Sequence, residues 1–303
     1  MQRNLTLDYF KLLLSILVIL IHLQPLTYGR IFVAYEISNG LARIAVPCFF
    51  IINGYFIDRF IDDGKKVWNY ILHLFLVYVV WTLIYGGLKF PDVITAFLTG
   101  GIHLWYVPAL IGAVLIVYAV RKMKINIHLT LGLVCVFVVI GYYIQNFTAL
   151  PEQYSAIVYR NCFFEGFPFV FMGYFLKQKD IISKLSKYKI VILGLALLFS
   201  VTLFAEVYIG FKNKWGMDIY LSLLPLCALL FILVMFFPKY SDKPDYIQSN
   251  LPSGIYFSHM LVLEFVLSGT SGERYILLPE IIFLTILLAS VIVIVNKRIK
   301  IFI

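Results

Sequence analysis

Residues 12–21 read LLLSILVILI, and this apolar stretch is flanked by Lys11 on one side and His22 on the other. Ten intervening residues place the two ionisable side chains about 16 Å apart along a helix, so they cannot touch. An ionisable group at membrane depth costs at least about 2.5 kcal/mol, and such groups usually serve a function. We therefore interpret Lys11 and His22 as marking two depths of one path across a bilayer.

The composition is that of an integral membrane protein. Apolar residues make up 62% of the 303 positions and charged residues 14%, with a mean hydropathy of +0.92. A soluble domain has about 25% charged residues. The net charge of +9 follows the loops, so no nucleic acid is needed to explain it. The four cysteines form no CxxC motif and no cluster with histidine, which argues against a disulfide framework or a metal site.

Apolar runs long enough to cross about 30 Å of hydrocarbon recur along the chain. They lie near residues 8–26, 40–57, 67–88, 104–120, 128–146, 161–176, 190–210, 218–237, 252–269 and 279–296. The sequence predicts an all-α polytopic membrane helical bundle of about ten transmembrane helices. We expect a single membrane-embedded domain over residues 1–303, with no soluble domain and with the first span retained rather than cleaved.

The distribution of lysine and arginine predicts the orientation of the chain. Basic residues concentrate in the loops at 59–66, 121–124, 177–189 and 297–300, and they are sparse in the alternate loops. Cytoplasmic loops carry this excess in membrane proteins. With an even number of spans, both termini are predicted to be cytoplasmic.

His22 and Lys11 in the first span are candidate catalytic residues. A neutral imidazole can take a proton from a hydroxyl and return it to a leaving group, although a membrane histidine can also simply hydrogen-bond between helices. Lys11 has two interpretations. It can provide positive charge that holds an anionic ligand arriving from the cytosol. Alternatively, its ammonium group can extend to the membrane interface and pair with Asp8 three residues earlier.

Two further segments carry polar groups toward the outer side. Arg43, in GLARIAVPCFFIINGYFI, requires a carboxylate, a phosphate or carbonyl oxygens unless it snorkels to the interface. His103, Trp105 and Tyr106 in GGIHLWYVPALIGA fit an aromatic belt, and they also fit a sugar-binding mouth where apolar sugar faces pack on rings.

The segment YRNCFFEGFPFVFMGYFL opens the sixth span with Arg160 and Asn161, followed by Glu165. Glu165 is not on quite the same helical face as Arg160, and it can neutralise either Arg160 or Arg43. These residues are candidates for positioning a substrate, with a structural ion pair as the alternative.

The segment SGIYFSHMLVLEFV places His259 and Glu264 deep in the ninth span, with Tyr256 one turn before His259. A carboxylate at this depth is costly unless it is paired or lines water. Glu264 therefore has two candidate roles, orienting an imidazole or pairing with Arg43.

Taken together, these segments resemble the acyltransferase-3 family of bacterial membrane acyltransferases. The family's first helix carries an arginine ten residues before a histidine, and the matching positions here are Lys11 and His22. RIAVPCFFIINGYFI, HLWYVPALIGA, RNCFFEGFPFVFMGYFL and SGIYFSHMLVLE are similar to later family motifs, in family order. Two positions depart from the pattern. Lys11 replaces an arginine and loses its bidentate fork, and Asn53 replaces a serine before Gly54.

The resemblance implies transfer of an acyl group, most often acetyl, from cytoplasmic acyl-CoA to a sugar hydroxyl of a cell-envelope glycan or a lipid-linked precursor. It implies a multi-pass protein of the bacterial cytoplasmic membrane, with acetyl-CoA as donor substrate and no resident cofactor or metal. The implied catalytic residues are His22, Lys11 and Glu264. The implied substrate-binding residues are Arg43, Asn53, His103, Trp105, Tyr106, Arg160, Asn161, Tyr256 and His259. The sequence is compatible with an oligomer.

Two other functions fit the buried charges. A transporter or flippase of a glycan or lipid precursor would use them as a substrate path, would consume no acyl-CoA and would tolerate His22→Gln. A non-catalytic membrane subunit of a glycan synthase would depend on no single intramembrane polar residue.

Overall fold

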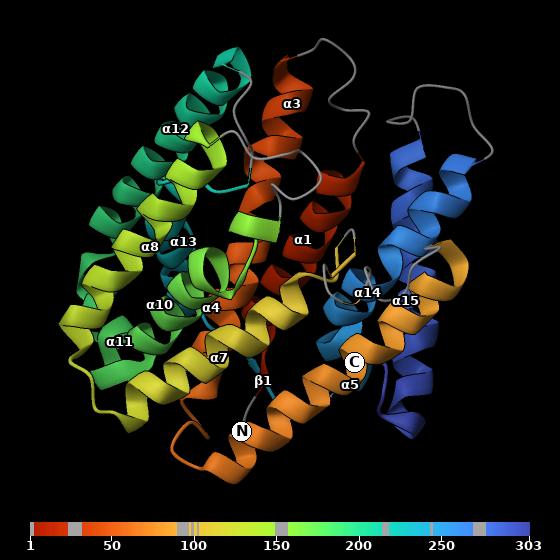
Figure 1. Ribbon diagram of the computed structural model, residues 1–303, viewed down its shortest axis with the longest axis horizontal. Helices are drawn as coiled ribbons and strands as arrows, with labels where there is room; N and C mark the ends of the chain where they lie inside the picture. Colours follow the sequence, from red (N-terminus) through yellow and green to blue (C-terminus); the bar gives the residue numbers. More distant parts are fainter. Residues whose placement is uncertain are drawn as a thin grey trace. The chain divides into compact units, whose positions relative to one another are not determined.

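The computed structural model describes residues 3–23, 32–89, 97, 100–101, 103–148, 157–213, 218–242, 245–268 and 277–303. The chain is almost wholly helical (Figure 1). Its one sheet, among these residues, pairs two strands of two residues each. Within the described ranges, seven helical segments are long and apolar enough to cross a membrane, which confirms the predicted all-α polytopic fold.

Each of the ten expected spans contains a helix, while the number that cross the membrane stays a prediction. Residues 24–26 of the first expected span lie outside the described residues. The main helices are α1 (Leu5–His22), α3 (Phe32–Asn39), α4 (Ala45–Ile57), α5 (Gly64–Lys89), α7 (Tyr106–Lys122), α8 (Ile127–Phe147), α10 (Phe167–Lys177), α12 (Lys189–Asn213), α13 (Leu223–Phe236), α14 (Tyr246–Ser268) and α15 (Leu278–Ile299). Shorter elements are η1 (Leu41–Ile44), η2 (Cys162–Gly166), η3 (Gln178–Asp180), α11 (Ile181–Leu185) and η4 (Ser186–Tyr188).

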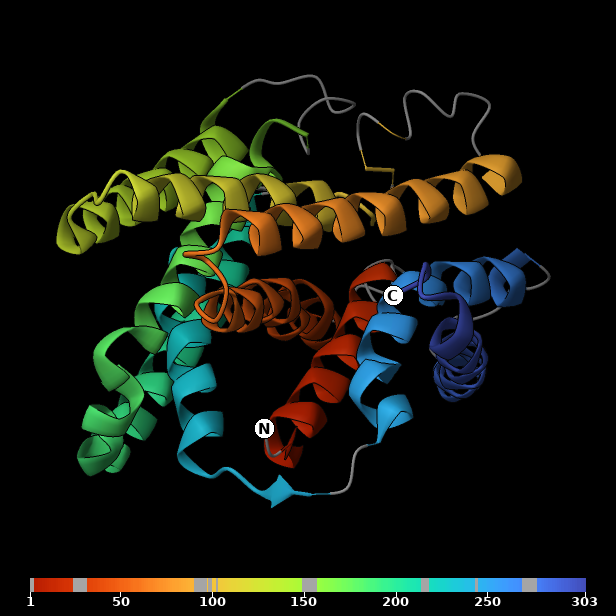
Figure 2. The same cartoon turned by 90° about the horizontal axis from the view of Figure 1, so that it is seen from below.

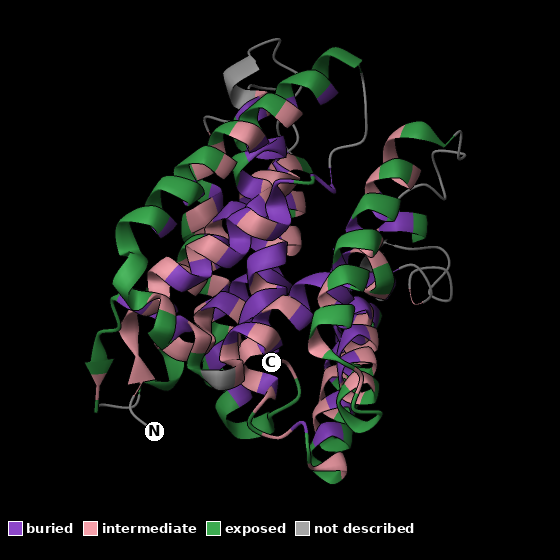
Figure 3. Ribbon diagram, turned by 90° about the vertical axis from the view of Figure 1, so that its left-hand side faces the viewer, coloured by how far each residue is buried: buried purple, intermediate pink, exposed green. Residues whose placement is uncertain are grey.

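Many helices carry buried residues on one side and exposed residues on the other (Figure 3). The exposed sides are apolar: Ile190 is 87% exposed, Phe265 78% and Phe283 66%. Water would penalise such surfaces, and lipid tails would not. The exposed faces are therefore those of a multi-pass membrane protein.

The described residues form two compact units. Unit 1 combines residues 1–46 with residues 237–303. In it, α14 packs along α15 (Figure 1), and α1 lies beside α14 (Figure 2). Ile19, Ile255, Ile281 and Ala289 belong to its apolar core. Unit 1 thus brings together helices from the two ends of the sequence.

A short strand pair fixes the start of α1. Strand β1 (Arg3–Asn4) pairs antiparallel with β2 (Tyr240–Ser241). The Thr6 hydroxyl donates to the Phe237 carbonyl at 2.8 Å and accepts from the Lys239 N–H at 3.0 Å. The Asn4 side chain caps α1 by accepting from the Leu7 N–H. These bonds set the position of α1 against the segment that precedes α14.

Unit 2 spans residues 47–236 and is organised around α10. The buried run at 167–171 explains why this helix contacts α7, α8 and α13. Two glycines bring α10 against α4. A Cβ added at Gly54 would lie 1.9 Å from the Val170 carbonyl oxygen, and one at Gly173 would lie 2.0 Å from that of Ile51. Only glycine at both positions permits this close crossing.

Candidate active site

The cationic end of α1 is built around one buried carboxylate. Asp8 is 6% exposed, and its two oxygens contact two cations: Lys11 Nζ at 2.7 Å and Arg3 Nε at 2.6 Å. Pairing with Asp8 is one of the two interpretations of Lys11 drawn from the sequence, and the structure shows this pair. The second cation, Arg3, lies before the first apolar run, and sequence reasoning missed it. The cluster of Arg3, Asp8 and Lys11 keeps one net positive charge.

His22 ends α1 and faces a second histidine. Its ring centroid lies 5.2 Å from that of His259 on α14, with the two planes at 43°. The ring of Tyr256, one turn earlier on α14, lies 6.2 Å from His259. The structure therefore brings together three predicted site residues: His22 from the first expected span, and Tyr256 and His259 from the ninth. The two histidines are 237 positions apart in the sequence.

The backbone of α14 fixes the tautomer of His259. This residue is fully buried, and its Nδ1 lies 2.7 Å from the Tyr256 carbonyl oxygen and 3.2 Å from that of Ile255. A carbonyl oxygen only accepts, so Nδ1 carries the hydrogen. In the neutral ring, Nε2 is then the basic nitrogen. His259 is held in one orientation beside His22.

Glu264 is half-buried on α14, five residues beyond His259. Five residues turn a helix by about 140° beyond a full turn, so the two side chains leave α14 in different directions. On His259, two backbone carbonyls already accept from Nδ1.

Arg43 lies where the second expected span is interrupted. Helix α3 ends at Asn39, the 3₁₀ turn η1 follows, and α4 begins at Ala45. Arg43 Nη2 donates to Asn39 Oδ1 at 3.4 Å across this break. In the same segment Glu36 is 7% exposed. Sequence reasoning missed Glu36 because its segment precedes the expected span, although an acidic residue beside an apolar run was a usable signal.

Asn53 in unit 2 ties three helices together. Its Nδ2 donates to the Tyr106 hydroxyl at 2.9 Å, and its Oδ1 accepts from the Tyr70 hydroxyl at 2.9 Å. The Tyr106 ring also lies 4.4 Å from that of Phe50. Asn53, Tyr70 and Tyr106 come from α4, α5 and α7, and we call them the amide node. The sequence does not identify Tyr70 as a site residue, because it cannot distinguish this tyrosine from an aromatic residue that faces lipid in an apolar helix.

His103 and Trp105 follow a glycine turn. Gly100 has φ +74°, and a Cβ there would lie 2.3 Å from the Trp105 Cα, so the turn requires glycine. His103 is buried, with its ring centroid 4.8 Å from that of Tyr85. Trp105 lies beside Phe50, with 6.4 Å between the ring centroids. These two aromatic contacts join the turn to α4 and α5.

Arg160 and Asn161 shape the entry to α10. Arg160 Nη2 contacts both oxygens of Asp218, at 2.7 and 2.6 Å. Asp218 is a partner that sequence reasoning missed, because it lies 58 residues away at the first position of the eighth expected span. Asn161 caps η2 by accepting from the Phe163 N–H at 2.9 Å. The π-helical η2 then turns Glu165 into the protein interior, where it is 5% exposed.

Known protein sequences resemble this chain over most of its length. The sequence matches the acyltransferase domain of the acyltransferase-3 family over residues 4–295. Relatives include an amino-acid racemase of Enterococcus faecalis, 26% identical over 296 residues, which is 86% of this chain and 41% of the relative. A second E. faecalis amino-acid racemase is 28% identical over 174 residues, covering 52% of this chain and 24% of the relative.

A serine/alanine racemase of Enterococcus gallinarum is 31% identical over 133 residues, or 36% of this chain and 18% of that protein. The chain thus spans less than half the length of these relatives. No solved structure matches it significantly. Because the family match covers nearly the whole sequence, the chain belongs to the acyltransferase-3 family.

Proposed function

We propose that this protein is a membrane O-acetyltransferase that moves an acetyl group from cytoplasmic acetyl-CoA to a sugar hydroxyl of a cell-surface polysaccharide or its lipid-linked precursor. The observation that carries the proposal is the His22–His259 pair, in which α14 orients one imidazole against the other. A general base needs a fixed neutral imidazole within reach of the proton that it takes. The bacterial cytoplasmic membrane is the proposed location.

The proposed reaction needs one proton relay and no resident cofactor or metal. His22 takes the proton of the acceptor hydroxyl while the hydroxyl oxygen attacks the thioester carbonyl carbon. The tetrahedral intermediate collapses, the carbon–sulfur bond breaks, and the imidazolium of His22 returns the proton to the leaving CoA sulfur. His259 orients His22 and, through its basic Nε2, stabilises the transient positive charge.

The donor is proposed to meet the cationic end of α1. The Arg3–Asp8–Lys11 cluster keeps a net positive charge after its internal pairing, which favours a phosphate of acetyl-CoA. Lys11 keeps this charge where the family pattern has arginine, although it offers no bidentate fork. Glu264 tunes the charge of the site from α14.

The acceptor is proposed to meet polar and aromatic residues. Aromatic rings pack on the apolar faces of sugars, and amide and guanidinium groups hydrogen-bond to their hydroxyls. The proposed binding residues are Arg43, Asn53, His103, Trp105, Tyr106, Arg160, Asn161 and Tyr256. Lipid-linked acceptors would reach such residues through the surrounding membrane lipids.

The test compares host cells that carry the wild-type gene, His22→Gln, His73→Gln or no gene. Mass spectrometry of the surface polysaccharide would show alkali-labile acetyl esters with the wild type and with His73→Gln, since His73 on α5 serves as the matched histidine control. His22→Gln and the deletion would lack them. Equal acetylation in all four strains, with altered glycan export, would contradict acyl transfer and favour transport.

A second assay follows the donor directly. Purified protein in liposomes, given acetyl-CoA and a glycan acceptor, is expected to release free CoA. His22→Gln is expected to lower that rate by at least about 100-fold, because general-base catalysis contributes about 10² to 10⁴. A transporter would release no CoA with either protein.

A further inference from the structure

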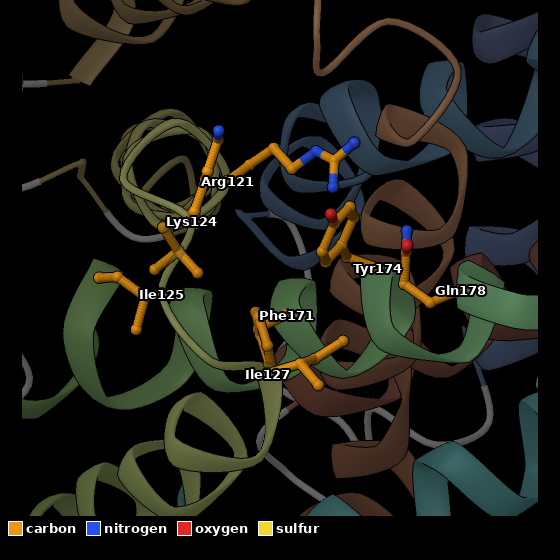
Figure 4. Close-up of a pocket in the computed structure, with 8 residues that line it drawn as sticks. Arg121, Lys124, Ile125, Ile127, Phe171, Tyr174 and Gln178 are labelled. Carbon is orange, nitrogen blue, oxygen red and sulfur yellow. The ribbon is translucent and has the colours of Figure 1, made fainter.

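A pocket of about 230 Å³ lies in unit 2, where α7 turns into α8 and meets α10. Its polar lining comes from Arg121 in the last turn of α7, Lys124 just beyond that helix, Tyr174 near the end of α10 and Gln178 at the start of η3 (Figure 4). Complete binding sites for drug-sized ligands measure about 300 to 1,000 Å³. The pocket therefore fits a charged headgroup rather than a whole nucleotide thioester.

The lining is cationic. Two of the lining residues are cations and, among the described residues that line the pocket, none is a carboxylate. Two acidic residues hydrogen-bond to lining residues: Asp62 accepts from Arg121 Nε at 2.8 Å and from Nη2 at 3.0 Å, and Asp58 accepts from Gln178. Arg121 is thereby held in a fixed orientation. Its guanidinium points toward the Tyr174 hydroxyl in Figure 4.

Lys124 has a backbone conformation that is uncommon for lysine. The turn has the pattern of a Schellman motif, with Ile125 N–H donating to Val120 and Lys124 N–H to Arg121. Lys124 therefore adopts φ +53°, a conformation that favours glycine or asparagine. Lys300 has the same conformation at the end of α15, where a cation suits the helix dipole. Only Lys124 of these two lines the pocket.

We propose that this pocket binds a phosphate ester, with Arg121 and Lys124 as its cationic contacts and the Tyr174 hydroxyl as a further hydrogen-bond donor. Guanidinium and ammonium groups with a neighbouring hydroxyl form the usual protein partners of phosphate. Two sources carry such a group on the side predicted to be cytoplasmic: a CoA thioester and an anionic phospholipid. Binding of a phosphate ester in this pocket does not depend on acyl transfer, and affinity measurements detect it without any turnover.

The first test measures binding of CoA, dephospho-CoA and adenosine 3′,5′-bisphosphate to the full chain in nanodiscs of zwitterionic lipid. Lys124→Asn removes the charge while keeping a residue that tolerates the backbone, so the thermal midpoint should hold or rise. We expect Lys124→Asn to weaken CoA binding about tenfold, because one charge-assisted contact is lost. Lys184→Gln, an exposed lysine on α11, is the control and should leave binding unchanged.

A second test uses the ion pair between Asp62 and Arg121, of which Arg121 lines the pocket. Arg121→Gln and Asp62→Asn both break the same pair, so a purely structural role predicts the same effect on binding from each. Phosphate binding predicts opposite effects. Arg121→Gln should weaken CoA binding about tenfold, and Asp62→Asn should strengthen it several-fold by releasing the guanidinium.

A lipid source gives a different pattern. The affinity for CoA would then be the same in the wild type and in Lys124→Asn, Arg121→Gln and Asp62→Asn. Phosphatidylglycerol in the nanodiscs would raise the thermal midpoint of the wild type, and it would not raise that of Lys124→Asn or Arg121→Gln. The proposal is overturned if neither CoA affinity nor the phosphatidylglycerol shift responds to Lys124→Asn and Arg121→Gln.

Discussion

His22 and His259, from opposite ends of the sequence, lie with their ring centroids 5.2 Å apart in unit 1. His259 is the better fixed of the two, because the α14 backbone holds its Nδ1 hydrogen. In the proposed mechanism it positions His22 and does not touch the reacting atoms. This distinction leads to a graded prediction.

Substitution of His259 should lower turnover to different extents. His259→Asn keeps an N–H near Nδ1, and we expect a fall in kcat of about tenfold; His259→Phe removes both nitrogens, and we expect about 100-fold. KM for the donor should change little with either. Steady-state CoA release checks this, and equal losses in the two variants would mean that His259 only fills space.

The Asp8 cluster predicts a charge-compensation effect. Asp8→Asn leaves Arg3 and Lys11 facing each other without a carboxylate, and we expect it to lower the free energy of unfolding by about 2 kcal/mol. Thermal denaturation in detergent measures the loss. Adding Lys11→Met to Asp8→Asn should recover part of the stability, whereas a further loss would argue against repulsion as the cause.

The α4–α10 crossing predicts a steric effect. Gly54→Ala or Gly173→Ala would put a methyl group about 2 Å from a facing carbonyl oxygen, so the helices must separate. We expect each to cost about 2 kcal/mol of stability or more. Gly132→Ala on α8 is the matched control, because nothing lies within 4 Å of its added Cβ. That variant should gain about 0.5 kcal/mol from the higher helix propensity of alanine.

The amide node predicts coupled losses. Tyr70→Phe and Tyr106→Phe each remove one hydrogen bond to Asn53, and each should cost about 1 kcal/mol of stability. Asn53→Ser supplies the residue usual in the family, but its single hydroxyl cannot replace both amide contacts. A double-mutant cycle over Tyr70 and Tyr106 measures the coupling, and strictly additive losses would argue against a shared node.

The Asp62–Arg121 pair predicts a small dependence of stability on pH. The hydrogen bond from Arg121 lowers the pKa of the Asp62 carboxyl below its ordinary value of about 3.9. The contribution is therefore present above the unfolded pKa and is lost as pH falls through the folded one. Both side chains are largely exposed, which limits the effect to a few tenths of a kcal/mol. The extra fall in thermal midpoint below about pH 4 should be absent in Arg121→Gln.

The hydropathy pattern predicted where the helices lie, because each span is rich in apolar side chains whether it packs against other helices or faces lipid. It could not reveal the 3₁₀ turn before α4 or the π turn at Cys162–Gly166, since a change of backbone hydrogen bonding leaves the apolar pattern intact. The ordered motifs selected His22, Tyr256 and His259 before any contact was known. The partners Arg3, Tyr70 and Asp218 lacked such a pattern, and only the packing identifies them.

Unit 1 draws on residues 1–46 and 237–303, whereas unit 2 is one continuous stretch. A ribosome releases α1 long before α14, so unit 2 can complete its own contacts while His22 still lacks His259. The histidine pair is therefore among the last contacts to form during biogenesis. In the proposed mechanism, a chain whose translation stops before α14 would insert and pack its middle helices, yet it would lack the residue that positions His22.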